Sequence, residues 1–127
     1  MLLNEYQAKA MTTCMESSNN LSYMLLNLVG EVGEFSSKVA KAIRKEEITI
    51  GGEAAIGIIV NHPVVENDTA YHFMCEELKK EAGDILWQLS GLCTVMGWSL
   101  EDVAQQNLDK LASRKQRNVI DGNGDNR

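Results

Sequence analysis

The sequence predicts an all-α protein, a bundle of four helices with a long insertion between the second helix and the third. Apolar residues recur at intervals of three and four along four stretches, which is the spacing of one helix face. The acidic pair in GEVGEFSSK recurs at the same spacing in KEAGDILW, as expected if both pairs lie on helices. A chain of 127 residues is long enough for one domain with its own core.

The composition excludes several classes of protein. The net charge of −6 argues against a nucleic-acid partner, which would require a basic face. The three cysteines show no CxxC spacing and predict neither a disulfide framework nor a zinc site. No stretch is long and apolar enough for a membrane span, and MLLNEYQAK lacks the apolar run of a signal peptide. The sequence therefore predicts a cytoplasmic protein with no membrane partner.

The first two helices are predicted on either side of a polar turn. Apolar residues from about Leu2 to Ser17 have helical spacing and predict the first helix. The run SSNNLS predicts a turn and an N-cap, so the second helix begins at about Leu21 and continues to Arg44. Its apolar stripe comprises Leu21, Met24, Leu25, Leu28, Val32, Phe35, Val39 and Ile43.

The second helix carries the first acidic pair. Glu31 and Glu34 lie three residues apart on the flank of the stripe, and Lys38 follows one turn later on the same flank. Gly30 and Gly33 adjoin these acids at a cost of about 1 kcal/mol each relative to alanine. They allow either the close approach of a backbone or ligand, or helix packing, and both interpretations stay open.

Residues 45–74 form the predicted insertion. ITIGGEAAIGIIV is rich in β-branched residues and glycine, and the polar stretch after it contains Pro63. We expect a short hairpin or a long loop, which in a compact domain is usually functional or mobile. His62 and His72 show no regular ligand spacing, so we interpret them as loop residues and not as metal ligands.

The third helix is predicted from about Phe73 to Gly97, with the glycine as its C-cap. Glu81 and Asp84 repeat the acidic spacing on the flank of a second apolar stripe, beside Glu77 and Gln88. If the two stripes pack together, the two acidic pairs converge and repel each other unless cations neutralise them. Oxygen-only ligands suit Mg²⁺, with Mn²⁺ as a possible substitute.

The last predicted helix follows Ser99, an N-cap candidate with Asp102 at the capping-box position. Asn107, Lys110 and Arg114 share one edge of this helix. Such an edge is often simply solvated. Opposite a metal-filled acidic cleft it would bind phosphate oxygens, and arginine can do so with two hydrogen bonds. Residues 117–127 form a polar, glycine-rich tail that we expect to be flexible without a partner.

GEVGE, KEAGDILWQL, NLDKLASR and GNGDNR resemble the MazG-like all-α nucleoside triphosphate pyrophosphohydrolases, over nearly the whole chain outside the insertion. The ExxE and ExxD motifs of that family fall on Glu31, Glu34, Glu81 and Asp84, and its basic helix falls on Asn107, Lys110 and Arg114. The interval between the two motifs is longer here than the family usually shows, because of ITIGGEAAIGIIVNHP.

The resemblance implies a catalytic helical domain at 1–116 that converts a nucleoside triphosphate to the monophosphate and pyrophosphate. Mg²⁺ would be held by the four acids, with Glu34 a candidate base that the sequence does not separate from a ligand. Lys110 and Arg114 would stabilise the triphosphate and the leaving pyrophosphate, and Lys38 and Asn107 would also contact the nucleotide. The family tends to form dimers or tetramers, so we expect a homodimer or homotetramer.

Two alternatives come from other classes. A di-iron carboxylate bundle uses Glu-x-x-His pairs, whereas Glu34 and Asp84 stand here where histidine would be needed. A non-catalytic dimerisation or regulatory module could retain the fold, but a retired enzyme should have lost some of the acids or the basic edge. The sequence leaves open which nucleobase and sugar the substrate carries and to which pathway the reaction belongs.

Overall fold

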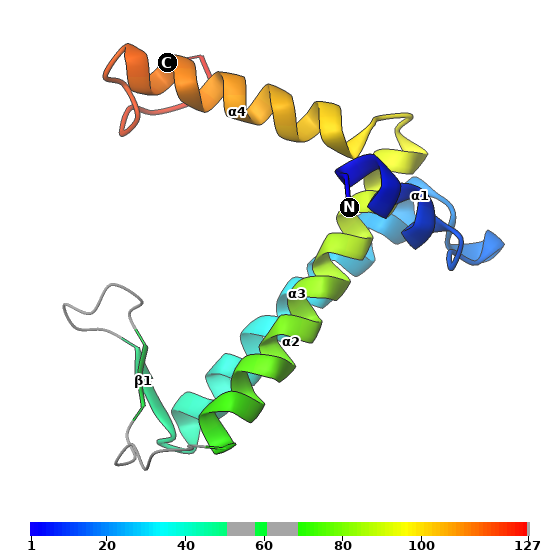
Figure 1. The fold of residues 1–127 in the computed structure, drawn as a ribbon. Coiled ribbons are helices and arrows are strands. Elements are labelled where there is room, and N and C mark those ends of the chain that lie inside the picture. Colours follow the sequence, from blue (N-terminus) through cyan, green and yellow to red (C-terminus); the bar gives the residue numbers. More distant parts are fainter. Residues whose placement is uncertain (51–57, 61–68, 127) are drawn as a thin grey trace.

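The described part of the chain contains four α-helices, and the all-α prediction is confirmed. The computed structural model describes residues 1–50, 58–60 and 69–126, with the backbone alone at 49, 50, 58–60 and 69–73. The helices are α1 (Leu3–Met11), α2 (Leu21–Arg44), α3 (Thr69–Val95) and α4 (Leu100–Gln116), and a short 3-10 helix spans Glu16–Ser18. α2 and α3 lie side by side, and α4 leaves them near α1 and points away (Figure 1).

The first helix is shorter than predicted, because α1 ends at Met11 and not near Ser17. The hydroxyl groups of Thr12 and Thr13 donate to the carbonyls of Lys9 and Ala10, each at 2.7 Å. Threonine side chains that bond to nearby carbonyls compete with the helical pattern. This local competition ends the helix although the apolar spacing continues.

The second helix has the predicted bounds, and its start is fixed by a side-chain cap. The Asn20 side chain accepts a hydrogen bond from the backbone N–H of Tyr23 at 2.9 Å. This bond satisfies one of the donors that the first turn of a helix leaves unpaired. Lys41 and Arg44 stand in the last turn, where positive charge suits the helix dipole.

Two short strands lie in the segment predicted as an insertion. β1 (Ile48–Ile50) and β2 (Ile58–Val60) pair antiparallel, with Ile48 opposite Val60. α3 begins at Thr69, earlier than the predicted Phe73. The expectations for the other residues of this segment, His62 and Pro63 among them, lie outside the described residues, as does the side chain of His72.

The α2–α3 pair forms the main packed contact. Met24 is fully buried and its side chain lies against Gly91, while Lys38 contacts Glu77 further along, so the two helices run antiparallel. The buried apolar residues of the described chain are Met24, Ala42, Ile48, Cys93 and Leu100. This core is small, and several large apolar side chains are left on the surface.

α1 fixes the turn that sets the direction of α4. The Gln7 side chain donates to the Trp98 carbonyl at 3.0 Å and accepts from the Leu100 N–H at 2.8 Å. Ser99 caps α4 as predicted, because its hydroxyl accepts from the N–H of Asp102 at 3.2 Å. α4 therefore starts in an orientation determined by α1 as well as by its own cap.

Candidate metal centre

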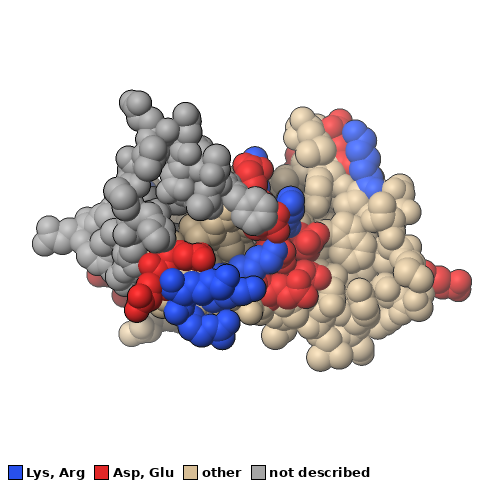
Figure 2. Space-filling model, turned by 90° about the horizontal axis from the view of Figure 1, so that it is seen from below, with Lys and Arg blue, Asp and Glu red and all other residues tan. Residues whose placement is uncertain are grey.

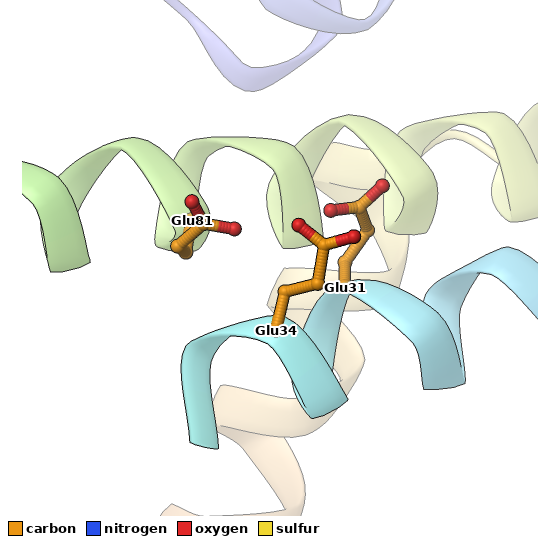
Figure 3. Close-up of side chains that lie close together, drawn as sticks. All are labelled: Glu31, Glu34 and Glu81. Atoms are coloured by element: carbon orange, nitrogen blue, oxygen red, sulfur yellow. The ribbon is translucent and has the colours of Figure 1, made fainter. Parts of the chain in front are cut away.

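Three carboxylates meet where the middle of α2 faces α3. Glu31, Glu34 and Glu81 each offer one oxygen, and these oxygens lie within 4.8 Å of one another. Glu31 and Glu34 point from α2 toward α3, and one oxygen of Glu81 points toward them (Figure 3). The helical spacing of the two acidic pairs predicted that they would converge. We call Glu31, Glu34 and Glu81 the acid cluster. The predicted apolar stripe of α2 is only partly buried, because Met24 lies in the core while Leu21, Leu25, Val32 and Ile43 are exposed.

Glu81 is the buried member of the acid cluster, with 7% of its surface exposed. Its Oε1 accepts a hydrogen bond from Lys38 Nζ at 2.6 Å. Its Oε2 is buried and has no hydrogen-bond partner in the described chain. A buried carboxylate oxygen without a partner is costly, and an ion bound at the acid cluster would supply one. The oxygen-only donor set and this orphaned atom therefore fit a hard divalent cation.

Glu31 is the member of the acid cluster whose pKa is raised. Desolvation raises the pKa of the Glu31 carboxyl above its ordinary value, and the charges of Asp84 and Glu34 raise it further. The side chain of Asn27, one turn earlier on α2, opposes this by donating to Glu31 at 3.0 Å. Without a cation, Glu31 therefore holds its proton to a higher pH than an isolated glutamate does.

Asp84 is the predicted ligand that the structure does not bring into the acid cluster. Its side chain is exposed and is not one of the carboxylates that meet within 4.8 Å. It is still near, because its charge raises the pKa of Glu31 and contributes to the raised pKa of Tyr6, which desolvation raises most. Asp84 lies within electrostatic reach on the side of the site toward α1.

Lys38 forms ion pairs with two carboxylates of α3. Its Nζ also lies 3.2 Å from Glu77 Oε2, while the other oxygen of Glu77 accepts from Lys80 at 2.6 Å. Hydrogen bonds to Glu81 and then Glu77 raise the pKa of the Lys38 ammonium. The lysine expected to contact the nucleotide is therefore paired with α3 in this structure.

The predicted basic edge on α4 does not face the acid cluster within one chain. α4 diverges from the α2–α3 pair along its length (Figure 1). Asn107 and Lys110 instead line an open cavity of about 530 Å³ that also borders Trp98 and Asp102 at the α3–α4 turn. Any contact between this edge and a substrate on the acid cluster needs a second copy of the chain or a movement of α4.

Arg114 is buried by the C-terminal tail, with only 5% of its surface exposed. Its Nη2 donates to the Asp125 carboxylate at 3.0 Å and to the carbonyls of Gly124 and Asp125. Lys110 Nζ lies 3.7 Å from the same carboxylate. The tail was expected to be flexible without a partner, and in this structure Arg114 of α4 is its partner.

Two lysines that the sequence argument did not select lie close to the site. Lys41 and Lys45 line a cavity of about 380 Å³ together with Lys38, Glu47 and Glu77. Figure 2, a view from the end where α2 finishes, shows basic side chains as a stripe between acidic ones. Lys41 and Lys45 follow Lys38 at i+3 and i+7, and this spacing could have revealed them in the sequence. A basic last turn is also common at helix ends, so the spacing alone does not indicate a site.

These features define an all-α protein whose two paired helices present a carboxylate cluster suited to a divalent cation. A family model described as MazG nucleotide pyrophosphohydrolase domain matches residues 19–119. The Gene 37 protein of Mycobacterium phage L5 is 38% identical over 112 residues, which cover 88% of this chain and 81% of the phage protein. No solved structure matches the chain. The chain belongs to the MazG nucleotide pyrophosphohydrolase domain family.

Membership of this family agrees with the resemblance seen in the sequence, and the matched residues include both acidic motifs and the basic edge of α4. No helix among the described residues combines the length and apolar character that crossing a membrane requires.

Proposed function

We propose that this protein is a Mg²⁺-dependent nucleoside triphosphate pyrophosphohydrolase that releases a nucleoside monophosphate and pyrophosphate. One observation carries the proposal: three carboxylates from two helices meet within 4.8 Å. The burial of Glu81 with an unpartnered oxygen supports it, because a surface acidic patch would leave that oxygen in water. The family to which the chain belongs supplies the reaction class.

Glu31, Glu34 and Glu81 would hold the ion, with Asp84 close enough to take part if its side chain turns inward. A bound Mg²⁺ offsets phosphate charge and lowers the pKa of a coordinated water. Glu34 is exposed and accepts no hydrogen bond from the described residues, so it is the carboxylate best placed to accept a proton from an attacking water. The hydrogen bond from Asn27 would orient Glu31, and the hydrogen bond from Lys38 would orient the buried Glu81.

The phosphate tail would be held by three cationic side chains and one amide. Lys110, Arg114 and Asn107 stay our proposed contacts, together with Lys38, but the α4 residues would reach the acid cluster from a second copy of the chain. Arg114 would first have to exchange Asp125 for phosphate, because that carboxylate occupies its guanidinium.

The same second copy would cover the exposed apolar surface. Leu26 and Val29 on α2 are 76% and 72% exposed, and Leu108 on α4 is 60% exposed. Leu26 and Val29 lie one turn apart on α2, and neighbouring exposed apolar side chains of this kind are typical of an interaction surface. We therefore propose a homodimer or a homotetramer of dimers, and Leu26→Lys should reduce the mass measured by light scattering.

The reaction is tested by incubating the protein with canonical and modified (d)NTPs, with and without Mg²⁺, and separating the products by anion exchange. We expect metal-dependent formation of monophosphate and pyrophosphate, and its loss in Glu34→Gln. Glu76→Gln is the matched control, because Glu76 is an exposed α3 acid that faces Lys79 at 3.9 Å. Diphosphate as product would move cleavage to the other bond, and no turnover on any nucleotide would favour the non-catalytic module.

The contribution of α4 from a second copy is tested by mixing two inactive variants, Glu34→Gln and Lys110→Met. If each site combines acids of one copy with α4 of the other, mixed dimers contain one intact site. Random mixing should then restore about a quarter of the wild-type sites. No recovery after unfolding and joint refolding would place Lys110 in the same chain as its acids, or outside the site.

A further inference from the structure

We propose that Lys38 is a resident cation of the metal centre, which fills the position of a second divalent ion between Glu81 and Glu77. The acid cluster then takes a divalent ion only on the side where Glu31 and Glu34 lie. This inference rests on the proposed function, since it assumes that the acid cluster binds a metal.

The geometry gives Glu81 two cation positions. Lys38 Nζ occupies the first, 2.6 Å from Oε1. The second is at Oε2, which is buried without a partner, and one oxygen of Glu81 points toward Glu34 and Glu31 in Figure 3. Lys38 follows Glu34 by one turn of α2, so it lies on the side of Glu81 away from Glu31. The buried carboxylate of Glu81 therefore lies between the Lys38 ammonium and the proposed position of the divalent ion.

The Lys38 ammonium bridges carboxylates as a metal ion would. It lies 3.2 Å from Glu77 Oε2 as well as 2.6 Å from Glu81 Oε1, and these acids stand on successive turns of α3. Removal of the ammonium leaves two carboxylate oxygens facing one gap, one of them on a residue that is 7% exposed. Such a gap is an oxygen site for a divalent cation.

An ordinary surface ion pair is the simpler interpretation, and Lys79 illustrates it. Its Nζ lies 3.9 Å from Glu76, and the two side chains are 78% and 68% exposed. Exposed pairs of this kind contribute little. Lys38 differs because its partner Glu81 has a side chain that is 9% exposed. A buried carboxylate needs a compensating charge, so the loss of Lys38 should recruit another cation.

The test counts Mn²⁺ ions bound by the full chain without nucleotide. Room-temperature electron paramagnetic resonance detects free Mn²⁺, so a titration gives the number bound per chain. We expect one ion in the wild type, lost in Glu34→Gln, and two ions in Lys38→Met. Lys38→Arg keeps a cation and should bind one, and the double variant Lys38→Met, Glu77→Gln should return to one. Circular dichroism confirms that each variant is folded.

Lys79→Met is the matched control, because it changes the net charge by the same amount on an exposed site. A second ion in Lys38→Met but not in Lys79→Met supports the inference. An equal rise in both variants, two ions in the wild type, or no rise in Lys38→Met overturns it. A wild type without any ion sensitive to Glu34→Gln would instead remove the metal site of the proposed function, so the two failures are distinguishable.

Discussion

Two glycines of α3 should respond differently to the same substitution. A Cβ at Gly83 would meet nothing within 4 Å, whereas at Gly91 it would meet the side chain of Met24, including Cε at 2.6 Å. Alanine stabilises a helix interior by about 1 kcal/mol relative to glycine. Gly83→Ala should therefore stabilise the protein by about 1 kcal/mol.

Gly91→Ala gains the same helical term but overpacks the contact between α2 and α3. Met24 is fully buried, so its thioether has to shift within the core. Overpacking costs about 1–3 kcal/mol. The helical term cancels between the two variants, so Gly91→Ala should be less stable than Gly83→Ala by about 1–3 kcal/mol, which for a chain of this size is about 4–12 °C in melting temperature.

The assay is urea unfolding followed by circular dichroism, in buffer with a chelator so that metal binding does not contribute. The double variant Met24→Ala, Gly91→Ala should lose less stability than the sum of the losses in the two single variants, because Met24→Ala removes the atoms that the new methyl group would meet. Equal stability of Gly83→Ala and Gly91→Ala would refute the packing of Met24 against Gly91.

Three further outcomes follow from the contacts. Glu31→Gln should raise the melting temperature of the metal-free protein at neutral pH. Burial raises the pKa of Glu31 in the folded state, so its penalty is present at high pH and disappears as pH falls below the ordinary value. Asp125→Asn should speed tryptic cleavage at Arg117. The Arg114 hydrogen bond lowers the pKa of Asp125, so the tail contact is retained above the ordinary pKa and lost on acidification. Gln7→Ala, which removes two bonds to the α3–α4 turn, should cost about 1–3 kcal/mol in urea unfolding.

The elements that the sequence predicted best are those with local signals at their ends. α2 begins after its asparagine cap and ends at Arg44, as predicted. Ser99 caps α4, and Gly97 has the positive φ of 70° that suits the end of a helix. α1 was predicted too long because Thr12 and Thr13 bond to nearby carbonyls, a competition that apolar periodicity does not reveal.

The candidates for the acid cluster followed from the sequence alone. A spacing of three on each helix places Glu31 and Glu34, and likewise Glu81 and Asp84, side by side. The packing of α2 against α3 then brings three of these four acids together. Helical periodicity is a local property, so the positions of neighbours along one helix follow directly from the chain.

The contacts of each charged side chain, in contrast, depend on how the helices pack. Lys38 pairs with α3, Asp84 stays exposed, and Arg114 is buried under the tail, although the sequence placed all three at one site. Distances between helices depend on how they pack, and the direction of α4 depends on bonds from α1 across the α3–α4 turn. These contacts join residues far apart in the chain, so no spacing within one helix predicts them.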